Sequence, residues 1–504
     1  AALAAGPAGI LDAAIAGRGA HGFSTVEVSS SPWGEVAVME RDGQRAFFRA
    51  GVLEAWDSAP EAAEQLALVP LALASPERVV YAGSSPDGAE MSAAWPGVRS
   101  VAVVAPEGSD WIEESRATEV RHGDARSFIS SLDADADLII VSSPMPLTLA
   151  GNRLLTREFF GECRSALAPG GILAFSLPLG ENRLAPLQAG IAASIAAASP
   201  FRTSLVVPLG GALFLMGDSL PEAGSVGEAV ILPEGYEPVM LDSMSLSWHL
   251  SPDALRRYME PICEAQARHN ADLDPVAFRM LMSGWGVYGG GAAAPAVLRA
   301  LAAAGALALL SAVLLRRPAA TALTLAPGIA GTGLEVLCLL VVQSVLGTAW
   351  VMVGAVTACF MGGFAAGSAS AGACRRGVRP PAVLLAAALP PAAASGAMLM
   401  YSSGMLGGAP LAAICLVCTA LSGAAAGAGF TAAAGAAGEA RMAGTAGLCE
   451  LGALAGSAAA CVALPMLLLP ALGAALSGIV LFALVLAFVP AGLARRGCSP
   501  SVRV

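Results

Sequence analysis

The chain has 504 residues, of which 56% are hydrophobic and only 13% charged, and its mean hydropathy is +0.68. These values exclude an ordinary water-soluble globular protein and predict a membrane protein with a soluble part. Residues 1–290 carry 18 basic and 35 acidic side chains, a net of −17 (18 − 35), whereas the remainder carries 10 and 3, a net of +7 (10 − 3). An acidic soluble half argues against nucleic acid as a partner.

The N-terminal part predicts a short leading segment and a small β unit. Residues 1–23 are rich in Ala and Gly, and the chain begins at Ala1 without Met, consistent with removal of a signal peptide or of an earlier membrane segment. In residues 24–75, apolar runs at 26–28, 36–39 and 46–48 predict strands, with a turn at 41–43. A helix is predicted over about 59–73.

Residues 76–288 are predicted to form an α/β Rossmann-like domain. Buried-type strands are predicted at 79–83, 101–104 and 138–141, with a further strand ending at Val120. A helix over about 156–167, a turn at 168–171 and a strand at 172–177 follow. The order strand, loop, helix, turn, strand is typical of a parallel sheet.

Several motifs of this domain resemble those of the spermidine synthase family, which has a methyltransferase-like Rossmann fold behind a small β-domain. The motifs that carry the resemblance are GDAR at 123–126, TREFF at 156–160, LAPGG at 167–171 and NADLDP at 270–275. The last of these resembles a signature of membrane-fused relatives. Residues 334–372 and 447–456 likewise resemble the membrane bundle of those relatives. The resemblance therefore covers most of the chain from about residue 30.

The resemblance also implies a vestigial nucleotide pocket. Its surviving residues are Gly83, Asp87, Gly88, Glu107 and Asp124. Glycines after the first strand allow close backbone approach to a cofactor. In the family the Asp of GDAR contacts the adenine edge, so Asp124 is the best surviving candidate, and capping the following helix is its alternative role.

The catalytic residues of the family are missing. Ser142 and Met145 stand where the family has two aspartates, one of which takes a proton from the attacking amine. Other departures lie at the substrate and ribose positions: Gly34 for Gln, Ala62 and Ala63 for a Tyr-His pair before Glu64, and Ala105 for an acid. We therefore predict no catalytic residue and no bound cofactor. No sequence motif for a metal is present, and no metal site is predicted.

Residues 292–496 predict an all-α transmembrane bundle of about seven helices. The expected spans are 294–315, 322–345, 348–373, 381–401, 409–432, 443–469 and 471–492. Glycine pairs four residues apart, at 363/367, 423/427 and 452/456, allow close helix contact. Arginines fall in every second loop, which by the positive-inside rule places the C-terminus in the cytoplasm and the soluble domain outside it. The expected location is the inner membrane.

Two acids and several cysteines leave alternatives open. Glu335 and Glu450 lie within spans and are either functional carboxylates or protonated acids hydrogen-bonded between helices. Cys415 and Cys418 are either a redox pair or small buried thiols. In the soluble half, Cys163 and Cys263 are expected to pair or to lie buried and unreactive.

Three functions are consistent with the sequence. The first is a catalytically degenerate spermidine synthase-like protein that acts as a structural or docking subunit of a membrane complex. The second is an active aminopropyl- or methyltransferase, and the third is an ion-coupled transporter that uses Glu335 and Glu450. The expected partners are membrane lipid and other subunits of a membrane complex, or a basic partner on the acidic domain.

Overall fold

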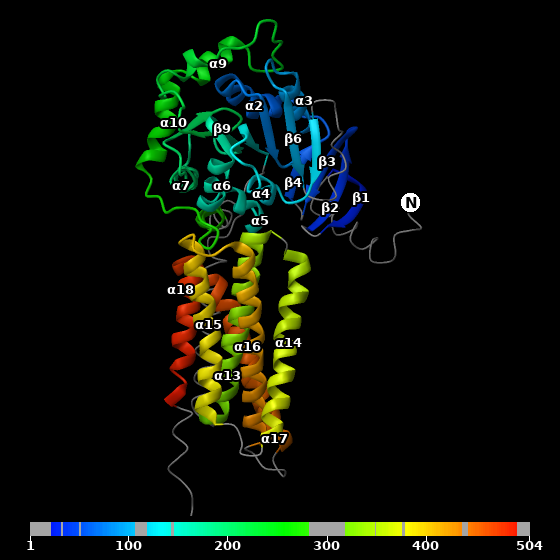
Figure 1. The fold of residues 1–504 in the computed structure, drawn as a ribbon, viewed down its shortest axis with the longest axis vertical. Helices are drawn as coiled ribbons and strands as arrows, with labels where there is room; N and C mark the ends of the chain where they lie inside the picture. Colours follow the sequence, from blue (N-terminus) through cyan, green and yellow to red (C-terminus); the bar gives the residue numbers. More distant parts are fainter. Residues whose placement is uncertain are drawn as a thin grey trace, which may run out of the picture. The chain divides into compact units, whose positions relative to one another are not determined.

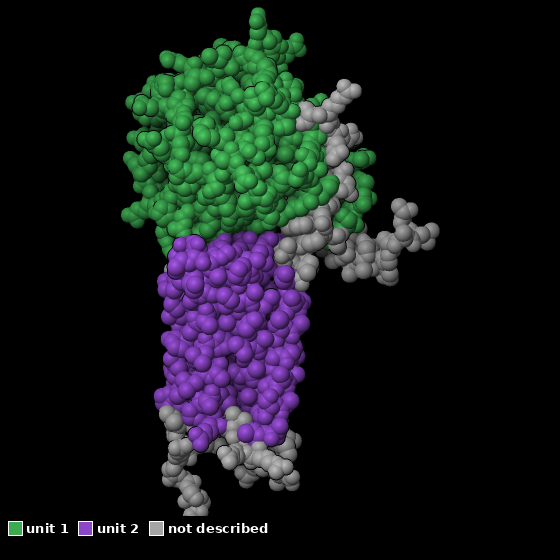
Figure 2. Space-filling model, viewed as in Figure 1, with its two compact units in different colours: residues 1–284 green, residues 285–504 purple. Residues whose placement is uncertain are grey.

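The computed structural model describes residues 22–31, 34–49, 52–105, 118–142, 146–281, 318–347, 349–374, 379–435 and 442–490. The chain divides into two compact units, Ala1–Gly284 and Trp285–Val504, which Figure 2 shows in different colours. Most of the predicted N-terminal segment 1–23 and the predicted junction around 288–292 lie outside the described residues. The two units are described separately below.

The small β unit is a four-stranded antiparallel sheet in the order β1-β2-β3-β4 (Figure 1). Its strands are β1 (Ser24–Ser31), β2 (Gly34–Arg41), β3 (Gln44–Arg49) and β4 (Val52–Trp56). Asp42 and Gly43 join β2 to β3 with φ of 55° and 85°. Two positive φ angles in a two-residue loop match the twist of a tight hairpin. The predicted hairpin is confirmed, and β4 extends it.

Among the described residues, the second sheet of this unit has seven strands in the order β10-β11-β9-β8-β5-β6-β7. Only β11 runs antiparallel to its neighbours, so the sheet is Rossmann-like with one reversed strand. The strands are β5 (Arg78–Ala82), β6 (Ser100–Ala105), β7 (Thr118–His122), β8 (Ala136–Val141), β9 (Leu167–Leu177), β10 (Thr203–Pro208) and β11 (Ala212–Gly217).

Helices cover both faces of this sheet. They are α2 (Pro60–Ala74), α3 (Pro86–Ala94), α4 (Ala125–Ile129), α5 (Leu149–Asn152), the 3-10 turn η1 (Arg153–Leu155), α6 (Arg157–Ala166), α7 (Pro186–Ala196), α8 (Val226–Ala229), α9 (Ser243–His249) and α10 (Pro252–Glu264). Side chains alternate across a strand, so Val80 and Ile139 join one core with α6 and α7. Tyr81 and Ile140 join the other core with α2 and α9.

The predicted turn at 168–171 lies inside β9 instead of before it. Leu167 pairs with Ala136 and Ile172 with Leu138, so four residues bulge out opposite a single residue of β8. Gly170 has φ of 87°, a value that glycine adopts easily and that lets the backbone turn back within the bulge. Because β8 pairs with β9 on both sides of the bulge, the predicted helix end, turn and strand belong to one continuous strand.

The second unit consists of apolar helices. They are α13 (Pro318–Val341), the π-turn η2 (Val342–Leu346), α14 (Ala349–Ala373), α15 (Pro380–Ser402), α16 (Gly408–Gly435), α17 (Met442–Ala463), the π-turn η4 (Leu464–Leu468) and α18 (Leu469–Leu486). Among the described residues, four helices are long and apolar enough to cross a membrane, and the apolar parts of α17 and α18 are shorter. The count of about seven spans is not confirmed, and the expected span 294–315 lies outside the described residues.

Two of the predicted glycine pairs hold α14 against α16. An added Cβ would lie 1.9 Å from the Ala420 carbonyl oxygen at Gly363, and 2.2 Å from that of Phe360 at Gly423. Gly367 and Gly427 make equivalent approaches one turn further along. The backbones therefore meet at a distance that a side chain at any of these positions would prevent.

Candidate functional site

The candidate site lies at the carboxyl ends of β5 and β8, where the order of the parallel strands reverses. β5 is the first strand of the sheet along the chain, and β6 and β8 flank it on opposite sides. The Ser142 amide donates to the Ala82 carbonyl at 3.0 Å, so the loops after β5 and β8 run side by side. Gly83 makes this possible, with φ of 109° and a Cβ position only 3.2 Å from the Ser142 carbonyl oxygen. Open α/β sheets bind ligands at such a switch point.

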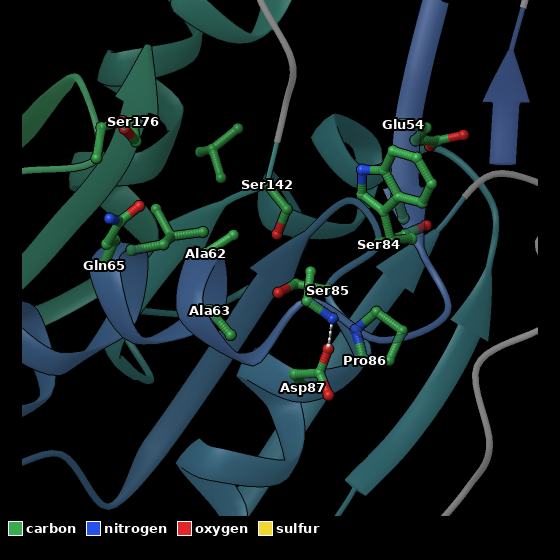
Figure 3. Close-up of a pocket in the computed structure, with 16 residues that line it drawn as sticks. Glu54, Ala62, Ala63, Gln65, Ser84, Ser85, Pro86, Asp87, Ser142 and Ser176 are labelled. Atoms are coloured by element: carbon green, nitrogen blue, oxygen red, sulfur yellow. Dashed lines mark hydrogen bonds between the residues drawn. The ribbon is translucent and has the colours of Figure 1, made fainter. Parts of the chain in front are cut away.

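A cavity of about 240 Å³ opens at this place (Figure 3). Its walls come from β4, α2, the loops after β5 and β8, the start of α3, the end of β9 and the turn between β10 and β11. The lining residues are Glu54, Ala55, Trp56, Ala59, Ala62, Ala63, Gln65, Leu66, Ser84, Ser85, Pro86, Asp87, Val141, Ser142, Ser176 and Gly210. Most of the polar groups are uncharged hydroxyls and one amide, so the cavity is polar but carries few charges.

Two hydroxyl groups in the cavity wall have no hydrogen-bond partner among the described residues. The Oγ atoms of Ser84 and Ser142 are both buried and unpaired within this part of the chain, and Ser84 is only 3% exposed. An unpaired buried hydroxyl costs free energy, and such groups are rare in folded proteins. These two serines follow the first and fourth strands of the parallel sheet, so they flank the switch point. Ser142 was predicted to stand at the position of a family aspartate, whereas Ser84 was not predicted to be a site residue.

The acids that line the cavity are engaged in other contacts. Asp87 accepts a hydrogen bond from the Ala59 amide at 2.5 Å, which ties α3 to the start of α2 (Figure 3). Glu54 also interacts with another group of the protein. Gly88 is not among the lining residues and packs on Tyr81, whose hydroxyl donates to the Gly88 carbonyl at 2.7 Å. The predicted loop residues therefore shape the cavity wall and its packing.

Glu64, the acid retained beside Ala62 and Ala63, is fully buried and does not line the cavity. Its carboxylate accepts four hydrogen bonds from one loop: from the Tyr236 hydroxyl at 2.6 Å and from the amides of Val239, Met240 and Leu241 at 2.9, 2.7 and 2.8 Å. Burial alone would raise the pKa of this carboxyl, but the hydrogen bonds outweigh it and hold the pKa below its ordinary value. Glu64 thus anchors a loop that sequence reasoning did not connect with it.

Asp124 caps α4 and pairs with a buried arginine. Its carboxylate accepts from the Ser127 amide at 3.0 Å and from the Ser127 hydroxyl at 2.7 Å, and both terminal guanidinium nitrogens of Arg153 contact it. Burial raises the pKa of Asp124, but Arg153 and Ser127 outweigh that effect and lower it. The capping role is therefore present, and Asp124 is not among the residues that line the cavity.

Three of the four motifs, GDAR, TREFF and NADLDP, meet in one buried polar network. Arg126 of GDAR donates to Asp272 of NADLDP at 3.0 Å and to both carboxylate oxygens of Glu162. Thr156 of TREFF donates to the same Asp272 oxygen at 2.7 Å, and Glu158 accepts from the Asp272 amide at 3.1 Å. Burial, and then the Asp272 charge, raise the pKa of Glu158. These three motifs therefore hold together segments that are far apart in the sequence.

Some predicted residues lie outside the described part of the chain or are placed differently than expected. Glu107 and Met145 fall in 106–117 and 143–145, which are not described. Cys163 is buried, and burial raises the pKa of its thiol, whereas Cys263 is exposed; both are free. The predicted pairing, or burial of both, is wrong because Cys163 faces the core and Cys263 faces solvent. Among the described residues, no cluster of His, Cys, Asp or Glu is arranged to hold a metal.

In the bundle, the predicted intramembrane groups have different surroundings. Glu335 on α13 is half-buried, whereas Glu450 on α17 is exposed. Cys415 and Cys418 on α16 are buried free thiols, and Cys415 hydrogen bonds with Cys338 of α13. The two acids therefore do not share one environment within the described part of the bundle.

Neither a family model nor a curated protein matches the chain. Among solved structures, the chain is similar to a spermidine synthase in complex with the transition state analogue AdoDATO and to one from Thermotoga maritima. Each shares 15% identity over 47% of this chain and 87% of its own, with a TM-score of 0.37. A probable spermidine synthase from Corynebacterium glutamicum shares 19% identity over 49% of this chain and 95% of its own, with a TM-score of 0.29. Identities and TM-scores this low say nothing about activity.

Proposed function

We propose that this chain is a catalytically degenerate, spermidine synthase-like membrane protein whose α/β unit serves as a structural or docking subunit of a membrane complex. The observation that supports this most directly is the composition of the cavity at the switch point. The position after β8 holds Ser142, whose hydroxyl has no partner in the described part of the chain. A hydroxyl there neither accepts the proton of an attacking amine at neutral pH nor holds a cationic substrate.

Neither Asp87 nor Glu64 is placed to act as the base that Ser142 cannot supply. A general base must lie within about 2.6–3.2 Å of the proton that it takes. Asp87 is held against the Ala59 amide, and Glu64 is turned into the protein, where it accepts four hydrogen bonds. Loss of one positioned base typically costs about 10²–10⁴ in rate.

A turnover assay with the full chain tests this proposal. The chain, reconstituted in lipid nanodiscs, is incubated with putrescine and decarboxylated S-adenosylmethionine, with an active spermidine synthase as the positive control. We expect no product, and no heat of nucleoside binding by calorimetry. Turnover that disappears in Asp87→Asn, with the fold unchanged, would instead establish an active aminopropyltransferase.

The α/β unit is proposed to lie outside the cytoplasm. This rests on the arginines in alternate loops of the second unit, at Arg316, Arg317, Arg375, Arg376, Arg379, Arg441, Arg495 and Arg496. Protease added to sealed, right-side-out cells should then cut within residues 1–290. Cleavage only after lysis would instead indicate that the α/β unit lies in the cytoplasm.

An ion-coupled transporter is the second candidate. It is favoured by the half-buried carboxyl group of Glu335 on α13, which lies near the buried Cys338 along the same helix. A buried intramembrane acid that binds and releases a cation is a common device in transporters. Proteoliposomes should then show proton or cation flux that Glu335→Gln abolishes. The sequence prediction also assigned Glu450, which is exposed on α17, to this transport. Flux that Glu450→Gln leaves unchanged would restrict the role to Glu335.

A further inference from the structure

Five large apolar side chains stand exposed within one stretch of the α/β unit, residues 231–248. They are Ile231 at 75% exposure, Val239 at 56%, Met240 at 44%, Met244 at 78% and Trp248 at 55%. Among the described residues of unit 1, the only other large apolar side chain exposed to this degree is Val26. Single exposed apolar residues are ordinary, but five of them within the eighteen residues 231–248 indicate an interaction surface.

The stretch is held in a fixed conformation from beneath. Glu64 binds the loop before α9 through four hydrogen bonds, and the Asp242 side chain caps α9 by accepting from the Ser245 amide at 2.7 Å. Met244 and Trp248 are four residues apart on α9, so they lie on the same helix face. The exposed side chains are therefore presented by an ordered backbone, which lowers the entropy lost on binding.

The opposite face of α9 is packed into the protein. Leu246 and Leu250 are 5% and 2% exposed and belong to the core formed with α2 and β6. The exposure of Met244 and Trp248 thus does not come from a helix that has failed to pack. The two side chains lie on the outer face of a helix whose inner face is buried in the core.

The same stretch is acidic. Glu234, Glu237 and Asp242 are exposed on it, and no Lys or Arg occurs between residues 203 and 255. The next basic residue, Arg256, is paired with Asp253 at 2.7 Å. Apolar anchors bordered by exposed carboxylates form a surface that is complementary to apolar groups bordered by cations.

We propose that residues 231–248, named here the acidic-apolar segment, bind a partner polypeptide that carries apolar anchors flanked by Lys or Arg. The inference rests on the docking role proposed above and gives that role a surface. A second copy of this chain fits less well, because a two-fold contact would place the acids against one another. An anionic lipid surface is disfavoured by the same repulsion.

The test uses the full chain in nanodiscs of zwitterionic phosphatidylcholine. The probe is a labelled helical peptide with a Leu face flanked by Lys, and the matched probe has Glu in place of each Lys. We expect the Lys peptide to bind at least about tenfold more tightly by fluorescence anisotropy, and added salt to weaken it. Trp248→Ala should weaken the Lys peptide by at least about tenfold, because buried Trp residues dominate such interfaces.

Two control variants separate surface chemistry from folding. Val26→Ser removes an exposed apolar residue from β1 and should leave peptide binding unchanged. The double variant Glu234→Arg/Glu237→Arg should weaken the Lys peptide and strengthen the Glu peptide. Far-UV circular dichroism and the melting temperature must match the parent protein for each variant compared.

Several outcomes would overturn the proposal. Equal affinity for the two peptides would contradict recognition of cations by the acidic-apolar segment. Binding that Trp248→Ala leaves unchanged would contradict the role of its apolar side chains. Concentration-dependent dimers that Trp248→Ala abolishes would assign the segment to a second copy, and binding to vesicles that contain phosphatidylglycerol would assign it to lipid. The turnover assay is independent of these results, so either proposal can fail alone.

Discussion

Replacing Glu64 with Gln should release the loop over residues 236–241 while leaving the rest of the α/β unit folded. One carboxylate oxygen accepts from the Tyr236 hydroxyl and the Val239 amide, and the other accepts from the amides of Met240 and Leu241. Gln has the same shape but only one acceptor oxygen. The amide nitrogen of Gln is a hydrogen-bond donor. It would therefore face two of the loop's donors, at the place where the carboxylate has an acceptor oxygen.

The size of the effect follows from the number of hydrogen bonds lost. Each buried amide left without an acceptor costs about 1–3 kcal/mol, so two cost about 2–6 kcal/mol of local stability. At about 1.4 kcal/mol per tenfold change, even the middle of this range corresponds to a population of the open loop several hundredfold larger. The remainder of helix α2 keeps its apolar contacts, so global unfolding should change less.

Amide hydrogen exchange on the full chain measures this directly. Exchange at Met240 and Leu241 should accelerate by at least about 30-fold in Glu64→Gln. Glu61→Gln is the matched control, because Glu61 lies exposed in the first turn of the same helix. Acceleration of less than about threefold at both amides, or equal acceleration in the control, would refute the assigned anchoring role.

The anchor should also depend on pH. The folded pKa of Glu64 lies below its ordinary value of 4.5, so the ionised form stabilises the loop fully above that value. This contribution should be lost as the pH falls below about 4.5 and through the lower folded pKa. Protection of the loop amides, corrected for intrinsic exchange, should follow this course in the parent protein and be independent of pH in Glu64→Gln.

Three further substitutions test other parts of the structure. Arg126→Ala should destabilise the α/β unit by about 3–5 kcal/mol in chemical denaturation, because it removes the cation that pairs with the buried carboxylate of Asp272 and with Glu162. The exposed Arg99→Ala should cost less than about 1 kcal/mol, and equal effects would contradict the structural role of the network. Gly363→Val should separate α14 from α16 and lower the melting temperature by several degrees, at an overpacking cost of about 1–3 kcal/mol. At the adjacent Gly362 an added Cβ meets no described atom within 4 Å, so Gly362→Val should have little effect, and similar melting curves for the two variants would refute the close contact. Ser84→Ala should raise stability by up to about 1 kcal/mol by removing an unpaired buried hydroxyl, and a loss of stability would mean that a ligand or water satisfies it.

The secondary structure of the α/β unit was accessible from the sequence because its signals are local. The strands that became β5, β6 and β8 are short apolar runs bounded by Gly, Pro and Ser, and Thr156 precedes an amphipathic stretch that became α6. The bulge within β9 was not predictable, because pairing on both sides of residues 168–171 depends on β8 and not on the local turn signal. The glycine pairs at 363/367 and 423/427 were recognisable as a pattern, but only packing showed that they face each other.

By itself, the sequence determined that Ser142, Ala62 and Ala63 carry neither an acid nor a base, since the type of residue at a position is independent of the fold. Only the tertiary structure decided what the retained polar residues do. Glu64 and Asp272 could have faced a ligand or the protein, because a carboxylate has the same sequence signature in either place. The chain buries both carboxylates among amides, hydroxyls and guanidinium groups contributed from more than 100 residues away. Long-range contacts of this kind are not encoded in any local pattern, so their partners become visible only when the sheet and its covering helices bring them together.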